Sequence, residues 1–303
     1  MFVGKTTLLE LLGEFRVEDL LEDVLEAAVI GFQDRVLGRQ IDRIVALQPI
    51  GEAGVGELAD RGVLVVHGHG HAGADVVLNG LGFEPWAGKL LKSSGYKGET
   101  VTAAKGVKAR AMQEEKGHSA HAGHAHKEMD PHAWQNPNHV ALYVRNIAAG
   151  LAKVDAAGAA TYQANAEAYV KELQALDTWA QAQIATIPAD KRKVITSHDA
   201  FGYFAAQYGV KFLAPQGLNT EAEPSAKQVA QLIKQIQREK IRAVFVENMS
   251  NPKLIAQLSK DAGATLGASL YADALSTVDQ PGATYLQMMR HNVTQLVAGM
   301  KRN

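Results

Sequence analysis

Two patterns of apolar residues alternate along the chain from position 74 onward. One is a short apolar run bounded by turn residues, which is typical of a buried strand and occurs at 74–80, 99–103, 194–196, 210–214, 242–246 and 265–270. The other is a longer stretch with helical spacing or helix-boundary residues, at 138–152, 161–184, 200–208, 225–240, 252–262 and 283–300. This alternation predicts an α/β fold in which helices cover both faces of parallel sheets.

The longest predicted helix covers residues 161–184. Its apolar side chains step by four and three residues and so form one stripe: Tyr162, Ala166, Tyr169, Leu173 and Leu176. Two dozen residues at a rise of 1.5 Å give a length of about 36 Å, which exceeds that of an average globular helix. Such a helix could span two lobes.

Composition narrows the classes of function. The 303 residues, with 31 Lys+Arg against 32 Asp+Glu, favour about two domains and argue against a nucleic-acid partner, which would need a basic surplus. No apolar run reaches the roughly 18 residues of a membrane helix, so we expect no stable membrane insertion. With 11 His and no Cys, any transition metal must be held by His, Asp or Glu.

Three candidate ligands fall at informative places. His198 directly follows the strand predicted at 194–196, and Asp273 follows the strand predicted at 265–270. Because the carboxyl ends of parallel strands share one edge of a sheet, these side chains can meet there. His132 lies in a turn just before the helix at 138–152. Convergence of the three is an inference from the fold, since no short spacing enforces it.

Five motifs resemble those of the solute-binding proteins of ABC-type zinc and manganese importers (cluster A-I). They are Asp130-Pro131-His132-Ala133-Trp134 with Asn136-Pro137, Ser197-His198-Asp199-Ala200-Phe201-Gly202-Tyr203-Phe204, Leu270-Tyr271-Ala272-Asp273-Ala274-Leu275, Asn79-Gly80-Leu81-Gly82-Phe83-Glu84 and Glu247-Asn248. The resemblance covers residues 74–303. It implies an α/β fold of two lobes, each with a parallel sheet flanked by helices, joined by one long rigid helix.

The same resemblance implies the function and the limits of the lobes. His132, His198 and Asp273 would bind Zn²⁺, which the protein would capture in the periplasm and deliver, as a monomer, to the membrane permease of an ABC importer. The chain would comprise an atypical segment at 1–73, an N-terminal lobe at 74–155 with a polar loop at 106–127, a linking helix at 156–187 and a C-terminal lobe at 188–303.

The start of the chain departs from the family. The family has a further ligand His about twenty residues before Asn79, but residues 55–60 contain none, and residues 1–73 show no signal peptide. We expect a start rearranged by a frameshift or a wrong gene model. Alternatively, one of His67, His69 and His71 substitutes as the ligand, because alternate residues of a strand share a face. The same segment is also typical of a Gly/His linker.

Zinc is favoured over manganese. Imidazole suits zinc, whereas manganese prefers carboxylate, and the manganese branch of the family carries Glu where this chain has His198. The segment 118–126 resembles the histidine-rich loop of the zinc branch. Its four imidazoles could capture Zn²⁺ and raise its concentration near the site: His118, His121, His124 and His126.

An enzyme is the competing class. A zinc hydrolase could use His132, His198 and Asp273, with an open coordination position and Glu247 as general base. A structural salt bridge explains Glu247 equally well. No nucleophile elbow and no helical zinc-protease motif are present. We therefore expect a binding protein and no catalytic residue.

Overall fold

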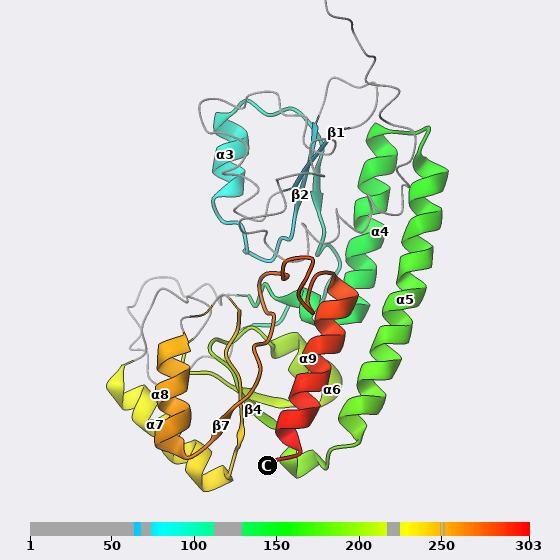
Figure 1. Cartoon of the computed structure of the whole chain (residues 1–303). Coiled ribbons are helices and arrows are strands. Elements are labelled where there is room, and N and C mark those ends of the chain that lie inside the picture. The colour runs from blue at the N-terminus through cyan, green and yellow to red at the C-terminus, as the bar shows by residue number, and fades with distance from the viewer. Residues whose placement is uncertain (1–63, 68–73, 112–128, 217–224, 249, 251) are drawn as a thin grey trace, which may run out of the picture.

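The computed structural model describes residues 64–67, 74–111, 129–216, 225–248, 250 and 252–303. These residues form two sheets with helices against them, and the predicted α/β class is confirmed (Figure 1). Among them, no helix combines the length and the apolar character needed to cross a bilayer. Of the polar loop predicted at 106–127, residues 112–127 lie outside the described residues.

The first sheet is mixed: the two strands within the predicted lobe are parallel, as predicted, and a further strand that precedes residue 74 is antiparallel. Its order is β1 (Leu64–His67), β2 (Ala74–Leu78) and β3 (Thr100–Thr102); β2 and β3 are parallel, but β1 is antiparallel to β2. Only six residues separate β1 from β2, and a parallel crossover needs a dozen or more.

Helices lie on both faces of this first sheet (Figure 1). The sequence did not predict α3 (Ala87–Ser93), whose Ala87 packs with Val76 of β2 on one face. On the other face lies α4 (Pro137–Val154), which begins with Pro at its first position and Asn136 as its cap; the Asn136 side chain accepts a hydrogen bond from the Asn138 N–H. Just before α4, the short 3₁₀ helix η2 (Ala133–Gln135) follows His132.

The predicted long helix is α5 (Ala159–Ala185), with 27 residues. It packs along α4 and then against α9 (Tyr285–Met300), so it runs beside both sheets (Figure 1). Its buried stripe includes Ala166, Tyr169, Leu173 and Leu176, as the spacing predicted. The largest hydrophobic cluster continues from Val77 in the first sheet through α4, α5 and α9 to Phe245 beside the second.

The second sheet is fully parallel. After η3 (Ala189–Lys191) come β4 (Lys193–Ile195), β5 (Lys211–Leu213), β6 (Ala243–Val244) and β7 (Thr265–Leu266), in the order β5-β4-β6-β7. Apolar side chains of α7 (Ala226–Glu239) and α8 (Pro252–Ala262) pack on Ile195 and Val244, while α9 contacts β4 and β6, and α6 (Gly202–Tyr208) contacts β5. All four carboxyl ends therefore point to one edge.

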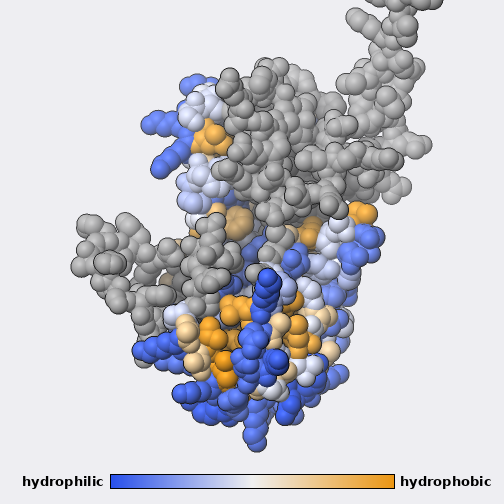
Figure 2. Space-filling model, turned by 60° about the vertical axis from the view of Figure 1, so that its left-hand side comes forward, coloured by the Kyte–Doolittle hydropathy of each residue, from blue (hydrophilic) through white to orange (hydrophobic). Residues whose placement is uncertain are grey.

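The surface of the C-terminal half is mixed in character. Hydrophilic residues surround its margin in Figure 2, with a group of hydrophobic residues reaching the surface between them. Large hydrophobic side chains that are exposed among the described residues are Met129, Leu266 and Val278.

Candidate metal centre

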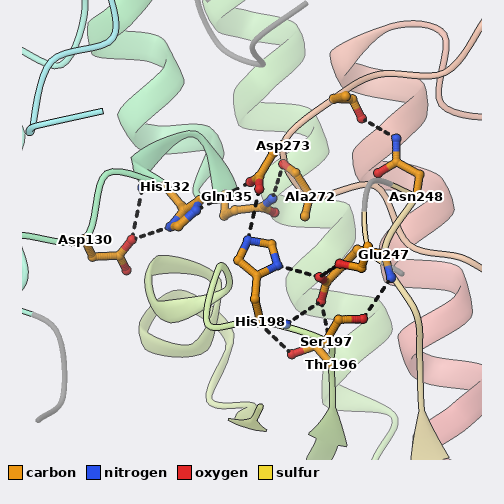
Figure 3. A network of polar contacts seen from close by, with 12 residues as sticks. Asp130, His132, Gln135, Thr196, Ser197, His198, Glu247, Asn248, Ala272 and Asp273 are labelled. Carbon is orange, nitrogen blue, oxygen red and sulfur yellow. Dashed lines mark hydrogen bonds and ion pairs between the residues drawn. The ribbon is translucent and has the colours of Figure 1, made fainter. Parts of the chain in front are cut away.

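Three predicted ligands meet where the carboxyl edge of the second sheet faces the turn before η2. One ligand atom each from His132, His198 and Asp273 lies within 4.8 Å of the others (Figure 3). His198 follows β4 by three residues, and Asp273 follows the short strand β7 and an isolated bridge at Leu270. The parallel arrangement predicted from the sequence thus brings together His198 and Asp273, which are 75 positions apart in the chain. The turn at His132, 66 positions before His198, meets them from the other side.

The ring nitrogens and the carboxylate face one another. Asp273 places Oδ2 3.0 Å from His198 Nε2 and Oδ1 3.5 Å from His132 Nε2. Both His side chains are buried, whereas a quarter of the Asp273 side chain is exposed. His198 Nε2 and Asp273 Oδ1 are buried atoms without a hydrogen-bond partner in the described part of the chain. Two imidazoles and a carboxylate that converge in this way fit a divalent transition metal.

Each imidazole is also held by a carboxylate of its own at Nδ1, the nitrogen that does not face Asp273. Asp130 Oδ1 lies 2.8 Å from His132 Nδ1 and also accepts the backbone N–H of His132 at 3.0 Å. Glu247 Oε2 lies 2.5 Å from His198 Nδ1, and its other oxygen accepts the Ser197 N–H at 2.8 Å. Such contacts fix the orientation of each ring and leave Nε2 to face a metal.

The carboxylates also set the charge state of His198. Burial lowers its pKa, but contact with Asp273 and Glu247, together with their charges, outweighs burial and raises the pKa to about 10. For Asp273, burial raises the pKa, yet the charge of His132, the contact with His198 and the charge of that ring together hold it below its usual range. In the metal-free protein a proton on His198 therefore takes part of the role of a cation.

The Asn79 motif supports the His132 turn from the first sheet. The Asn79 side chain donates to the carbonyl of Pro131 at 3.1 Å and accepts from the Tyr143 hydroxyl at 2.7 Å. Glu84 in turn accepts the N–H groups of Asn79 and Gly80 at 2.6 and 3.1 Å. Gly80 has φ +87°, and a Cβ there would lie 2.5 Å from Thr102 Cγ2, so the turn requires glycine.

Side-chain amides hold the segment around Asp273. Asn292, buried in α9, accepts the Tyr271 N–H at 3.0 Å and donates to the Tyr271 carbonyl at 2.7 Å. Asn248 donates to the carbonyl of Ala274 at 3.1 Å. Neither role was predicted from the sequence. Asn248 belongs to a matched motif that could have indicated it, but Asn292 sits in an ordinary amphipathic helix with no local signal.

Of the alternative ligands, the structure describes the backbone of His67 alone. The backbone of His67 pairs with Ala74 at the start of β2, whereas Asn79 and the His132 turn lie beyond the end of that strand. Five strand residues separate the two ends by about 16 Å. His69, His71, His118, His121, His124 and His126 lie outside the described residues.

The geometry gives no support to the hydrolase alternative. Glu247 is buried and bonded to His198, the Ser197 N–H and the Ser250 hydroxyl, so it is not placed to act as a general base. The structural salt bridge was the better interpretation of this residue. The Ser197 hydroxyl lies near the Glu247 N–H, at 3.4 Å, and no contact of this hydroxyl with an imidazole is present among the described residues.

Comparison with known proteins points to one family. Residues 71–299 match the family model described as ZnuA, zinc-uptake complex component A, periplasmic. Manganese-binding lipoprotein MntA of Halalkalibacterium halodurans is 32% identical over 230 residues, which cover 76% of this chain and 73% of that protein. Metal ABC transporter substrate-binding lipoprotein ScbA of Streptococcus cristatus is 32% identical over 57% of this chain and 56% of that protein.

Solved structures agree with this match. The periplasmic zinc binding protein TroA from Treponema pallidum superposes with a TM-score of 0.64 at 25% identity, covering 74% of this chain and 79% of that chain. The matched part begins near residue 71, so the family resemblance predicted for residues 74–303 is confirmed in both sequence and fold.

Proposed function

The chain belongs to the ZnuA family of periplasmic metal-uptake components, and from this premise we propose that it captures Zn²⁺ and delivers it to an ABC-type importer. The observation that carries the proposal is the cluster of His132, His198 and Asp273, whose ligand atoms lie within 4.8 Å. The partner would be the importer's membrane permease with its ATPase. The place of capture would be the periplasm, in agreement with the family description.

The chemistry of the donors favours zinc. Two imidazoles backed by Asp130 and Glu247 make a histidine-rich site, and imidazole suits zinc, whereas manganese prefers oxygen ligands. The relatives do not decide the metal, since one is described as manganese-binding and one solved structure as zinc-binding. Three protein ligands leave one position of a tetrahedral zinc ion open, which limits the affinity.

Two further parts of the proposal concern the chain around the site. The lobes would be residues 74–155 and 188–303, with 156–187 linking them and restricting hinge opening. His118, His121, His124 and His126 would capture Zn²⁺ weakly, outside the tight site. Deleting residues 118–126 should then remove weak sites from a calorimetric titration and leave one tight site; loss of the tight site would show that it lies in this loop.

Competition between metals tests the proposal. The purified chain is dialysed against equal Zn²⁺ and Mn²⁺, and the bound metal is counted by mass spectrometry. We expect one tightly bound Zn²⁺ in the unmodified chain and a narrower preference in His198→Glu. His291→Gln is the matched control because it retains a donor for the Ser269 carbonyl, which His291 Nε2 contacts at 2.9 Å. Preference for Mn²⁺ by the unmodified chain would contradict the zinc assignment.

A further inference from the structure

Two adjacent side chains of η2 hold the residue that precedes the Asp273 ligand. Trp134 Nε1 donates to the carbonyl of Ala272 at 2.9 Å, and Gln135 Nε2 donates to the same oxygen at 3.0 Å. We call Trp134, Gln135 and Ala272 the clasp. All three residues are buried, and the bonds join segments 137 and 138 positions apart in the chain. Figure 3 shows the Gln135 side chain reaching from the His132 turn to Ala272.

The clasp is anchored on both sides. The Tyr285 hydroxyl, at the start of α9, donates to the carbonyl of Trp134 at 2.8 Å. The Trp134 ring makes edge contacts with Phe83 and with the ligand His132, each at a centroid distance of 5.2 Å. The Trp134 indole thus contacts Phe83 of the Asn79 motif and the ring of His132. It also bonds the backbone of Ala272, the residue before Asp273.

We propose that the clasp keeps the His132 turn and the Asp273 segment in register in the metal-free protein, so that the cargo ion meets a preassembled site. This inference rests on the proposed function. It makes Trp134 and Gln135 positioning residues for metal capture, although neither belongs to the ligand set. The alternative is that the metal itself draws the two segments together.

The chemistry of the clasp supports independence from the metal. Its donors are an indole N–H and an amide, its acceptor is a backbone carbonyl, and none of these atoms belongs to the ligand set of His132, His198 and Asp273. Opening the clasp would leave two donors and one acceptor unpaired in a buried place, which is strongly disfavoured.

The other end of the Gln135 amide is informative too. Gln135 Oε1 is buried and has no hydrogen-bond partner among the described residues. An amide that leaves its oxygen unpaired while its nitrogen bonds Ala272 is retained at a cost in stability. That cost accords with a role in placing Ala272 and, with it, Asp273.

Hydrogen exchange of the indole N–H groups tests the metal independence directly. The chain has three Trp, so Trp86→Phe and Trp179→Phe assign the three indole signals in an NMR spectrum. In metal-free protein we expect the Trp134 indole to exchange at least about 100-fold more slowly than the half-buried Trp179 indole, because only sub-global opening exposes it. Protection that appears only after Zn²⁺ is added would overturn the proposal.

Substitutions test the consequence for capture. Trp134→Phe removes the donor and retains a ring, and Gln135→Leu is a second variant should the first not fold. Each should release Zn²⁺ roughly 10-fold faster, the lower end of what losing an outer-shell partner costs in metal affinity. The matched controls are Trp179→Phe, a half-buried residue of α5 whose ring lies against Arg290, and Gln174→Leu, which is exposed.

The outcomes separate the clasp from the function. Variants that lower the melting temperature of metal-free protein but release Zn²⁺ like their controls would overturn the clasp as a positioning device. Absence of tight Zn²⁺ binding in the unmodified chain would contradict the proposed function instead. The indole measurement on metal-free protein cannot produce that second result, so the two failures are distinguishable.

Discussion

The two histidines of the centre resemble each other in geometry and differ in how they are supported. His132 is held by Asp130, two residues away in the same turn, whereas His198 is held by Glu247, which lies 49 residues away and follows the neighbouring strand β6 by three residues. His132 depends on one local turn braced by the first sheet. His198 depends on the parallel pairing of β4 with β6, so its geometry is a property of the second sheet as a whole. Loss of a support should therefore have different consequences on the two sides.

Removal of either imidazole should give the largest loss of zinc-dependent stability. The loss should be the same for His132 as for His198. A metal bound by both regions stabilises the folded chain, by about 2.7 kcal/mol when zinc is present at 100 times its Kd. His132→Ala and His198→Ala should each abolish most of the zinc-dependent rise in melting temperature, while His291→Gln keeps it. Thermal melts with and without Zn²⁺ measure this. An undiminished shift in both alanine variants would place the metal elsewhere, and His67, His69 and His71 would be the ligands to substitute next.

Substitution of the carboxylates that hold the two rings, Glu247 and Asp130, should lower zinc affinity to different extents. Glu247→Gln keeps the shape but removes the charge that holds His198, and we expect zinc affinity to fall by about 10- to 100-fold. Asp130→Asn should cost about 10-fold, at the low end of that range, because the backbone N–H of His132 still finds an oxygen acceptor in the same turn. Calorimetric titrations of both variants give the comparison. Equal losses of zinc affinity would show that the support from Glu247 matters no more for metal binding than the support from Asp130.

The sequence predicted the convergence of His132, His198 and Asp273 better than it predicted the residues that support them. Parallel strands place His198 and Asp273 at one edge, which follows from the alternation of elements alone. The role of Asn292 could not be predicted in this way, because its contact with Tyr271 depends on how α9 packs. The antiparallel β1 also escaped prediction, since an apolar run does not encode strand direction. Helix α3 was missed because its seven residues are too few to show a clear period.

The charge of His198 predicts how metal binding depends on pH. Its pKa of about 10 lies above the unfolded value of about 6.5, so its contribution to the stability of metal-free protein is complete below pH 6.5 and is lost as pH rises through 10. Zinc needs the neutral ring, so binding near pH 8 should release about one proton. Affinity should rise with pH up to about 10 and fade toward pH 5.

Calorimetry in buffers of different ionisation enthalpy counts that released proton. Glu247→Gln removes one of the charges that raise the His198 pKa. On binding zinc, this variant should therefore release fewer protons than the unmodified chain at the same pH. Asp130→Asn is the matched comparison, because Asp130 does not contact the His198 ring. Equal proton release in Glu247→Gln and the unmodified chain would contradict the assignment of the titrating group to His198.

The smallest effect should come from a glycine that limits the space beside the local support. Gly202 begins α6, and a Cβ there would lie 2.5 Å from Asp130 Oδ2. Gly202→Ala should therefore displace the Asp130 carboxylate and turn His132 slightly, without touching His198. We expect a loss of zinc affinity of less than about 10-fold, below the cost of removing the Asp130 charge.

The control is Gly88→Ala in α3, where a Cβ meets nothing within 4 Å and alanine should stabilise the helix by roughly 0.5–1 kcal/mol. Proton release on zinc binding should stay unchanged in Gly202→Ala, because it belongs to the other side of the centre. If Gly202→Ala altered proton release as much as Glu247→Gln does, the two supports would not be independent, and the division of the centre into a local and a distant half would be wrong.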